Sequence, residues 1–345
     1  MAPRESVLTA DSLEKRYRIK GRRLGHETVS AVDGVSLDLG RGEALGIVGE
    51  SGCGKSTLAR MLVGLEKPTS GSIRLGGEEI TGPAGLGRRD LARRIQMIFQ
   101  DPYTSLNPRL PIVDIVAEPL RVHRIETDRS RLRNRVAELL EQVNLPAEMM
   151  NRYPHQFSGG QRQRIGIARA LALNPEVLVC DEPVSALDVS VQAQVINLLR
   201  DLQRRTGIAV IFIAHDLSVV RHVSDRTMVM YLGRLAEIGP THELFTTPTH
   251  PYTQALLSAS PAVDRDRRGA RPSRIMLLGD PPSPTDPPSG CRFRTRCRLA
   301  TDDCAGIRPP LDPIVAGRPD HRAACIHKDE ALRDAAGLVS HQLAE

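Results

Sequence analysis

The chain has 345 residues, 40% of them hydrophobic and 26% charged, which is typical of a globular protein large enough for two domains. Its net charge of +6 is carried by scattered arginines with few aromatic residues between them, so we interpret it as a solvated surface and expect no nucleic-acid partner. No apolar run approaches the length of a membrane span, and residues 1–17 lack the apolar core of a signal peptide. We therefore expect a cytosolic protein whose six cysteines are not paired as disulfides.

From residue 6 to about residue 239, short apolar runs alternate with helical patterns. Runs 44–48, 177–180 and 209–214 are rich in β-branched residues and predict buried parallel strands. Two helices are predicted by apolar side chains at helical spacing, Leu132, Val136, Leu139, Leu140 and Val143 in the first, and Val191, Val195, Leu198, Leu199 and Leu202 in the second. Residues 228–239 predict two further strands around a Leu-Gly turn. Strands that alternate with helices predict an α/β layer fold.

The stretch GESGCGKS, residues 49–56, fits the phosphate-binding pattern G-x-x-x-x-G-K-[ST] and follows a predicted strand. Its glycines let the backbone turn tightly and present N–H groups to an anion, and the next helix points its positive dipole end at the same anion. Lys55 can reach the β- and γ-phosphates of a nucleotide, and Ser56 can offer its hydroxyl to Mg²⁺. We assign nucleotide binding to the whole loop, which comprises Gly49, Glu50, Ser51, Gly52, Cys53, Gly54, Lys55, Ser56 and Thr57.

A second stretch, VLVCDEP at 177–183, ends a predicted strand in two carboxylates. Asp181 would lie at the strand end, where it can hold the Mg²⁺ of the loop. Glu182 can polarise an attacking water as a general base. A strand that ends in Asp-Glu is a weak signal alone and a strong one beside the phosphate loop.

Four further motifs resemble those of the ATP-binding cassette (ABC) ATPases and occur in that family's order. FSGGQRQR (157–164) resembles the signature motif, and SALD (185–188) resembles the D-loop. Gln100 looks like the residue of the Q-loop, and His215 looks like the switch histidine. The resemblance implies an α/β fold with a RecA-like core and a helical subdomain.

The resemblance also implies residue roles. Catalysis is assigned to Glu182, His215 and Gln100, and Mg²⁺ binding to Ser56, Gln100 and Asp181. Ser158, Gly159, Gly160 and Gln161 would contact the ATP bound on a second subunit, and Asp188 of the D-loop is assigned to the nucleotide site. Because SGG before a helix is itself an anion-binding helix start, two head-to-tail subunits could close both sites over ATP. An ordinary helix cap at Ser158 and a polar residue at a strand end for His215 are the alternatives.

Tyr17 is the ring expected to stack on adenine, with a packed surface tyrosine as the alternative. Only its position relative to the phosphate loop supports this assignment.

The segments FQDPYTSLNPR (99–109), THPYTQALLSASP (249–261) and GDPPSPTDPPSGCRFRTRC (279–297) closely resemble the ATPase subunits of dipeptide and oligopeptide importers. FQDPY is more like the second ATPase of such pairs than the first. The implied domains are an ATPase domain at 1–245 with a helical subdomain at about 101–168, an extension at 246–330 and a tail at 331–345. Residues 261–290 have the Pro-rich composition of a linker.

This narrower resemblance implies ATP and Mg²⁺ as cofactors and ATP hydrolysis that drives peptide import. The partners would be a second ATPase subunit, by this resemblance a paralogue, two transmembrane permeases and an extracytoplasmic solute-binding protein, with the chain at the cytoplasmic face of the membrane. Related importers of this family also transport nickel and other small solutes, so the resemblance defines the transported solute less closely than the type of transporter. A soluble ABC ATPase that acts on nucleic acid is a further alternative, and an exporter subunit is disfavoured by the importer-like tail.

Cys291, Cys297, Cys304 and Cys325 are spaced C-x5-C-x6-C-x20-C in a segment rich in proline. Four thiolates suit a soft metal, and the spacing is wider than that of the paired C-x-x-C knuckles typical of zinc. Some related importer ATPases hold a 4Fe–4S cluster at a similar arrangement. We therefore favour a 4Fe–4S cluster here, and zinc and plain reduced thiols stay open.

Overall fold

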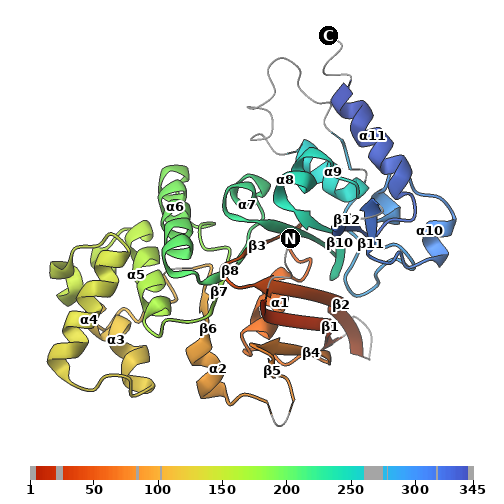
Figure 1. Cartoon of the computed structure of the whole chain (residues 1–345). Coiled ribbons are helices and arrows are strands. Elements are labelled where there is room, and N and C mark those ends of the chain that lie inside the picture. The colour runs from red at the N-terminus through yellow and green to blue at the C-terminus, as the bar shows by residue number, and fades with distance from the viewer. Residues whose placement is uncertain are drawn as a thin grey trace.

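The computed structural model describes residues 5–20, 26–82, 85–101, 103–259, 275–277, 279–315 and 318–340 (Figure 1). Much of the expected linker, residues 261–274 and 278, and the last five residues of the expected tail lie outside the described residues. In the part of the chain that is described, no helix combines the length and the apolar character that crossing a bilayer requires.

The centre of the fold is an eight-stranded sheet in the order β11-β12-β10-β9-β3-β8-β7-β6. Its parallel part comprises β6 (Ile95–Ile98), β7 (Val177–Asp181), β8 (Ala209–Ile213), β3 (Ala44–Val48) and β9 (Arg226–Tyr231). Every residue of β3, β7 and β8 is buried, which is why these strands are continuous apolar runs in the sequence. The prediction of buried parallel strands at 44–48, 177–180 and 209–214 is confirmed.

The remaining strands of this sheet are antiparallel. β10 (Arg234–Pro240) returns from β9 through Leu232 and Gly233, whose φ values of 43° and 80° match a two-residue turn of type I′. β12 (Arg318–Ala323) and β11 (Asp312–Val315) then extend the edge next to β10. The C-terminal extension therefore adds strands to the central sheet, a pairing that the sequence did not predict because these segments carry no apolar alternation.

A second, four-stranded antiparallel sheet has the order β2-β1-β4-β5. It comprises β1 (Ser6–Lys20), β2 (His26–Gly40), β4 (Ser70–Leu75) and β5 (Glu78–Glu79). Its inward side chains, among them Leu8 and Leu39, share one buried cluster with Leu58 of α1 (Lys55–Leu62) and with Ile47 and Ile211 of the central sheet. The helix that follows the phosphate loop is thereby packed within the cluster that joins the two sheets.

Helices lie between β6 and β7 and around the sheet. The chain between β6 and β7 forms α3 (Ile112–Val122), α4 (Arg129–Gln142), the short 3-10 turns η1 (Ala147–Asn151) and η2 (Pro154–Gln156), and α5 (Gly159–Leu171). The other helices are α2 (Arg88–Arg94), α6 (Val189–Thr206), α7 (Leu217–Val223), α8 (Thr241–Thr246), α9 (Pro251–Ser258), η4 (Arg294–Arg296), α10 (Asp303–Gly306) and α11 (Lys328–Ser340). Figure 1 shows α3, α4 and α5 at one end of the molecule and α10 and α11 at the other. The two helices predicted from apolar spacing are confirmed as α4 and α6.

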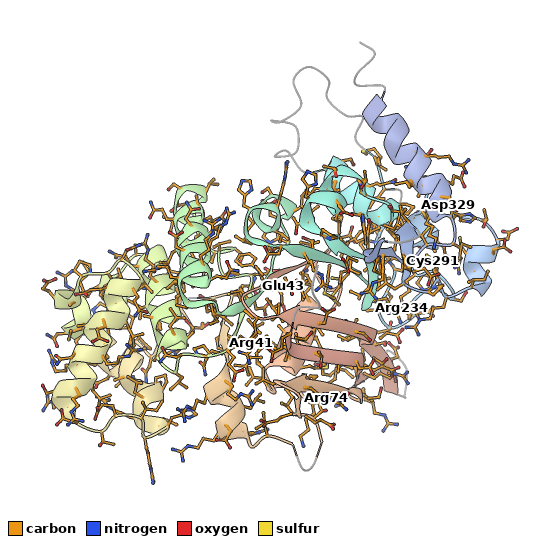
Figure 2. The ribbon with its side chains drawn as sticks, in the orientation of Figure 1. Arg41, Glu43, Arg74, Arg234, Cys291 and Asp329 are labelled. Carbon is orange, nitrogen blue, oxygen red and sulfur yellow. The ribbon has the colours of Figure 1, made fainter. Side chains whose placement is uncertain are left out.

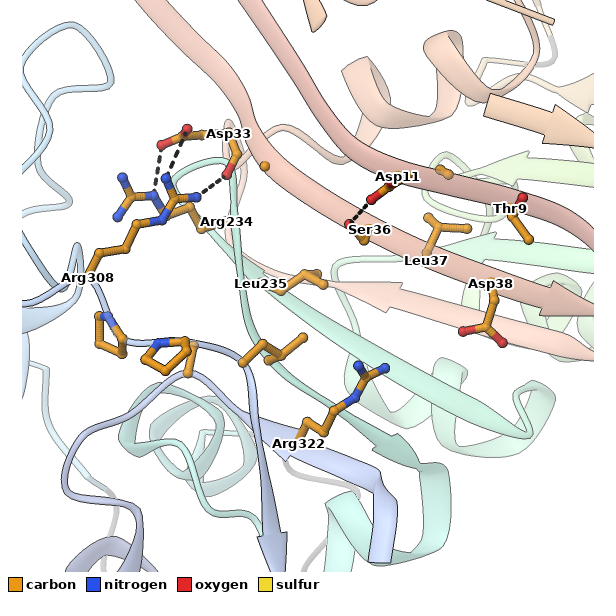
Figure 3. Close-up of a pocket in the computed structure, with 16 residues that line it drawn as sticks. Thr9, Asp11, Asp33, Ser36, Leu37, Asp38, Arg234, Leu235, Arg308 and Arg322 are labelled. Carbon is orange, nitrogen blue, oxygen red and sulfur yellow. Dashed lines mark hydrogen bonds and ion pairs between the residues drawn. The ribbon is translucent and has the colours of Figure 1, made fainter. Parts of the chain in front are cut away.

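The extension is attached to the second sheet through Asp33, a buried carboxylate of β2 (Figure 3). Its Oδ2 lies 2.8 Å from Nε of Arg234 and 2.5 Å from Nη2 of Arg292, and its carbonyl oxygen accepts from Nη2 of Arg308 at 2.9 Å. Burial raises the pKa of Asp33, but the hydrogen bond from Arg234 and the charges of Arg292, Arg234 and Arg308 outweigh it and lower the pKa overall. The carboxylate is therefore charged at neutral pH and holds three arginines from two parts of the chain.

A second buried carboxylate makes a similar attachment on β10. Glu237 is fully buried and accepts from the backbone N–H groups of Thr249 and His250, both at 2.9 Å. Its Oε1 also lies 2.8 Å from Nε2 of His321 on β12. Together with Asp33, it ties the extension to the two sheets through charge-assisted hydrogen bonds.

Asp33→Asn should lower the free energy of unfolding by about 3 kcal/mol at pH 7, because it leaves the buried guanidinium of Arg292 and the partly buried one of Arg234 without their counter-charge. Because the folded pKa of Asp33 is depressed, its contribution is present above the unfolded pKa of about 3.9 and is lost as the pH falls through the folded pKa. Urea unfolding of the variant and the unaltered chain at several pH values measures this. Asp11→Asn is the control, since Asp11 is exposed and bonded to serines. Equal losses in the two variants would contradict the prediction.

Candidate nucleotide-binding and catalytic site

The phosphate loop runs from the end of β3 to the start of α1, where the sequence placed it. Two of its glycines have no room for a side chain. A Cβ on Gly49 would lie 2.2 Å from the carbonyl oxygen of Met230, and one on Gly54 would lie 2.1 Å from that of Ala31. Gly54 also has a φ of 104°, which only glycine adopts without strain. The neighbouring strands therefore fix the curled shape of the loop.

Lys55 lies inside this curl and is only 4% exposed. Its Nζ donates to the carbonyl oxygens of Gly49 at 2.7 Å and Glu50 at 3.1 Å. The loop thus surrounds a buried ammonium with its own backbone, at the first residue of α1, where the helix dipole is positive. This arrangement favours an anion such as the phosphates of a nucleotide.

Ser56 and Asp181 provide adjacent oxygen atoms beside the loop. The Oγ of Ser56 donates to Oδ1 of Asp181 at 3.0 Å, and Asp181 is the last residue of β7. Burial raises the pKa of Asp181, and the hydrogen bond from Ser56 and the charges of Arg60 and Lys55 only partly offset this. A hydroxyl and a buried carboxylate at hydrogen-bond distance are the hard oxygen ligands that suit Mg²⁺. The residues present therefore fit the metal that a nucleotide brings.

Glu182 lies between the two other residues assigned to catalysis. Its Oε2 accepts from Nε2 of Gln100 at 2.9 Å and lies 3.9 Å from Nδ1 of His215. The φ of Glu182 is 47°, an uncommon value for a residue other than glycine, and its N–H donates to the carbonyl oxygen of Ile213 at 3.0 Å. Gln100, Glu182 and His215 follow the parallel strands β6, β7 and β8, so the sheet brings them together at one edge.

Ser158 and Gln161 form a reciprocal cap at the start of α5. The Oγ of Ser158 accepts from the N–H of Gln161 at 3.3 Å, and Oε1 of Gln161 accepts from the N–H of Ser158 at 3.0 Å. A Cβ on Gly160 would lie 2.2 Å from Val191 of α6, and one on Gly159 would lie 3.3 Å from Leu187. In the described part of the chain, no hydrogen bond joins residues 158–161 to the phosphate loop. Within one copy this segment is thus a helix cap beside the D-loop.

Asp188 of the D-loop caps α6. Its Oδ1 accepts from the N–H of Val191 at 2.9 Å and from Oγ of Ser190 at 2.7 Å. These hydrogen bonds lower the pKa of Asp188, because they favour its charged form. Val191 therefore lies next to both segments: its N–H bonds to Asp188, and its side chain fills the space beside Gly160 of the SGGQ segment.

Tyr17 lies on β1, paired with Val29 of β2, and is half-buried. The Nζ of Lys15 lies 5.0 Å from the centre of its ring. A cation therefore interacts with this ring, and its stacking on adenine stays a prediction.

The four cysteines of the extension lie near enough to affect one another. The N–H of Cys291 donates to the carbonyl oxygen of Cys304 at 2.8 Å, and Cys291 lies close to Arg234 (Figure 2). Burial raises the pKa of Cys325 to about 12, with smaller contributions from the charges of the other three cysteines, and burial raises the pKa of Cys297 to about 11. These groups are neutral thiols at pH 7. Among the described residues, no three His, Cys, Asp or Glu side chains are arranged to hold a metal, so this geometry does not support the expected 4Fe–4S cluster.

Two residues outside the predicted site contact the phosphate loop. The N–H of Glu50 donates to Oη of Tyr252 at 2.9 Å, and Nη1 of Arg296 lies 2.9 Å from Oε2 of Glu50. Both belong to the extension. Their segments, THPYTQ and CRFRTRC, are part of the family resemblance, but nothing in their spacing indicates a contact with the loop.

Comparisons with known proteins match both parts of the chain. The family model described as ABC transporter matches residues 32–185, and the model described as oligopeptide/dipeptide transporter, C-terminal region, matches residues 236–304. An oligopeptide transport ATP-binding protein, OppF, from Salmonella typhimurium is 53% identical over 304 residues, which cover 88% of this chain and 89% of that protein. A di/tripeptide transport ATP-binding protein, DppF, from Pseudomonas aeruginosa is 50% identical over 329 residues, or 95% and 99% of the two chains.

A solved structure agrees with the fold. A dimeric ATP-binding cassette in a post-hydrolysis state with bound ADP and Pi matches with a TM-score of 0.59 and 30% identity, over 68% of this chain and 98% of that chain. The α/β fold of the ATPase domain is thereby confirmed.

Gly54→Ala should abolish measurable nucleotide binding, because the added Cβ can only be accommodated if the loop or the strand that carries Ala31 moves. Binding of a fluorescent ATP analogue to the full chain measures this. Gly77→Ala is the matched control. Gly77 also has a positive φ, 84°, but no atom within 4 Å of an added Cβ, so it tests backbone strain without the clash. Nucleotide binding by Gly54→Ala at the strength of the control would show that the loop shape is not required.

Proposed function

The chain belongs to the ATP-binding proteins of ABC transporters, in the group with the oligopeptide/dipeptide C-terminal region, and we propose that it energises the import of dipeptides or oligopeptides. It is an ABC ATPase, so its reaction is ATP hydrolysis. The observation that carries the proposal is the hydrogen bond between Ser56 of the phosphate loop and Asp181, which places the loop beside Glu182, the next residue in the chain. It occurs in a chain about half identical to two peptide-transport proteins.

Each of the site residues has a separate role in the proposed hydrolysis of ATP. Residues 49–57 enclose the phosphates, and the buried ammonium of Lys55 meets their negative charge. Ser56 and Asp181 would hold Mg²⁺, which neutralises charge on the β- and γ-phosphates when bound. Glu182 accepts a proton from the attacking water. Gln100 orients the Glu182 carboxylate by donating to it, and His215 lies beside it toward solvent.

A second copy of the signature segment would complete each site. Ser158–Gln161 begins α5, whose N-terminal N–H groups are suited to phosphate, yet within one chain it makes no hydrogen bond to the described phosphate loop. The dimeric state of the solved cassette supports pairing with a second subunit, and the arrangement we propose for the pair is head-to-tail. By resemblance the partner is a paralogous ATPase, and Asp188 would lie at the interface between the two ATPase subunits.

The proposed complex further contains two transmembrane permeases and an extracytoplasmic solute-binding protein, with this chain at the cytoplasmic face of the membrane. The names of the relatives support peptides as the cargo over nickel, and transport over action on nucleic acid. ATP and Mg²⁺ are the cofactors. A 4Fe–4S cluster at Cys291, Cys297, Cys304 and Cys325 stays a prediction from resemblance alone.

Glu182→Gln should retain ATP binding and lose hydrolysis by at least about 100-fold, because the amide keeps the shape of the side chain but cannot accept the proton of the water. Steady-state phosphate release and equilibrium ATP binding by the full chain separate the two effects. Glu138→Gln is the control, since Glu138 lies on α4 and pairs with Arg135 away from the site. Hydrolysis at the unaltered rate in Glu182→Gln would remove this residue as the base.

The transport function is tested by purifying the tagged chain from detergent-solubilised membranes of its source. We expect permease subunits and a second ATPase to co-purify, and mass spectrometry of the preparation to find bound peptide. Recovery with nucleic acid and without any permease would contradict the proposal. Iron and sulfide assays on the same sample, prepared anaerobically, test the cluster separately.

A further inference from the structure

Glu50 of the phosphate loop is hydrogen-bonded to two residues of the C-terminal extension. Its N–H donates to Oη of Tyr252 at 2.9 Å. Its carboxylate accepts from Nη1 of Arg296 through both oxygens, at 3.1 and 2.9 Å. Its carbonyl oxygen accepts from Nζ of Lys55 at 3.1 Å. The same carbonyl oxygen accepts from the N–H of Cys53 at 3.2 Å. Each polar group of Glu50 is thus engaged, and two of its four hydrogen-bond partners come from the extension.

Both extension residues are themselves rigidly placed. Tyr252 is fully buried in α9, and its ring centre lies 4.7 Å from that of Tyr231 and 5.3 Å from that of Phe293. Burial raises the pKa of Tyr252, so its hydroxyl stays neutral and accepts the N–H of Glu50. The side chain of Arg296, in η4 next to Phe293, is 8% exposed. An aromatic cluster therefore fixes the two groups that hold the loop.

We propose that Tyr252 and Arg296 are positioning residues for ATP binding, which hold the phosphate loop open in its nucleotide-ready shape through Glu50. They act through Glu50, whose own carbonyl oxygen contacts the buried Lys55. A loop rich in glycine loses much conformational freedom when it is ordered around a ligand. Contacts that order the loop beforehand remove part of that cost from binding, so the extension sets the affinity for ATP. This inference rests on the ATP binding of the proposed function.

The extension does not depend on this contact for its own attachment. Asp33 and Glu237 anchor it independently, through Arg292, Arg308 and His321. Loss of the Arg296–Glu50 pair should consequently leave the extension docked and change the loop alone. If the pair had only a structural role, its loss would instead lower the stability of the fold and leave the Michaelis constant for ATP unchanged.

The test compares Arg296→Ala, Arg296→Lys and the unaltered full chain by fluorescent ATP binding and steady-state hydrolysis. In Arg296→Ala we expect the Kd and KM for ATP to rise about tenfold, within the range of coupling between sites, with kcat within about twofold. Arg296→Lys should restore most of the affinity, because a single nitrogen serves both carboxylate oxygens and an ammonium can replace it.

Arg298→Ala is the matched control. Arg298 lies two residues further in the same segment and bonds to Asp334 and Gln254, at 2.5 and 2.7 Å, without contacting the loop. We expect it to bind ATP as the unaltered chain does. Thermal melting of each variant checks that the extension remains folded.

A double-mutant cycle tests whether Arg296 affects ATP binding through Glu50. If Arg296 acts through Glu50, then Glu50→Gln combined with Arg296→Ala should weaken ATP binding no more than Arg296→Ala alone. Unchanged affinity in Arg296→Ala, or an equal loss in Arg298→Ala, would overturn the positioning role while the proposed function stands. No ATP binding by the unaltered chain would end both.

Discussion

The parallel register of β6, β7, β8 and β3 is the constraint on which the site depends. Parallel strands place their carboxyl ends at one edge of the sheet, so residues far apart in the chain meet there. The phosphate loop follows β3, Asp181 ends β7, and His215 follows β8. The hydrogen bond between Ser56 and Asp181 and the contacts of Glu182 with Gln100 and His215 are consequences of this register. A strand displaced by one residue would turn each of these side chains to the other face.

The same sheet also connects the extension to the phosphate loop through paired strands. β12 pairs with β10, and β10 pairs with β9, which lies directly beside β3. The extension is therefore part of the layer that carries the phosphate loop. Buried carboxylates at Asp33 and Glu237 complete the attachment. Because a charge in the interior is costly unless it is paired, these carboxylates also specify where the extension docks.

The two segments that we propose to form a nucleotide site lie in separate places within one chain. The phosphate loop lies between the two sheets, whereas the signature segment caps α5 beside α6. A helix N-terminus with unpaired N–H groups gains most from an anion, and the proposed second subunit would supply it. The predicted metal site of the extension is not supported in the same way. Burial raises the pKa values of Cys297 and Cys325, and no metal-holding group is found among the described residues.

The sequence alone determined the features that local chemistry controls. The glycines of residues 49–54, the apolar run 44–48 and the Leu-Gly turn of the β9–β10 hairpin each have a signal within a few residues, because φ preference and side-chain period are local properties. Motif order further predicted the site residues Gln100, Glu182 and His215, and the sheet brings these residues together.

Only the tertiary structure decided what holds the loop. Tyr252 and Arg296 lie 202 and 246 residues from Glu50 in the chain, and Arg292 lies 259 residues from Asp33. Such contacts have no periodicity and no spacing that a sequence can display. They exist because the antiparallel strands β10 and β12 carry the extension back to the sheet, and the packing of the whole chain then selects which buried charges meet.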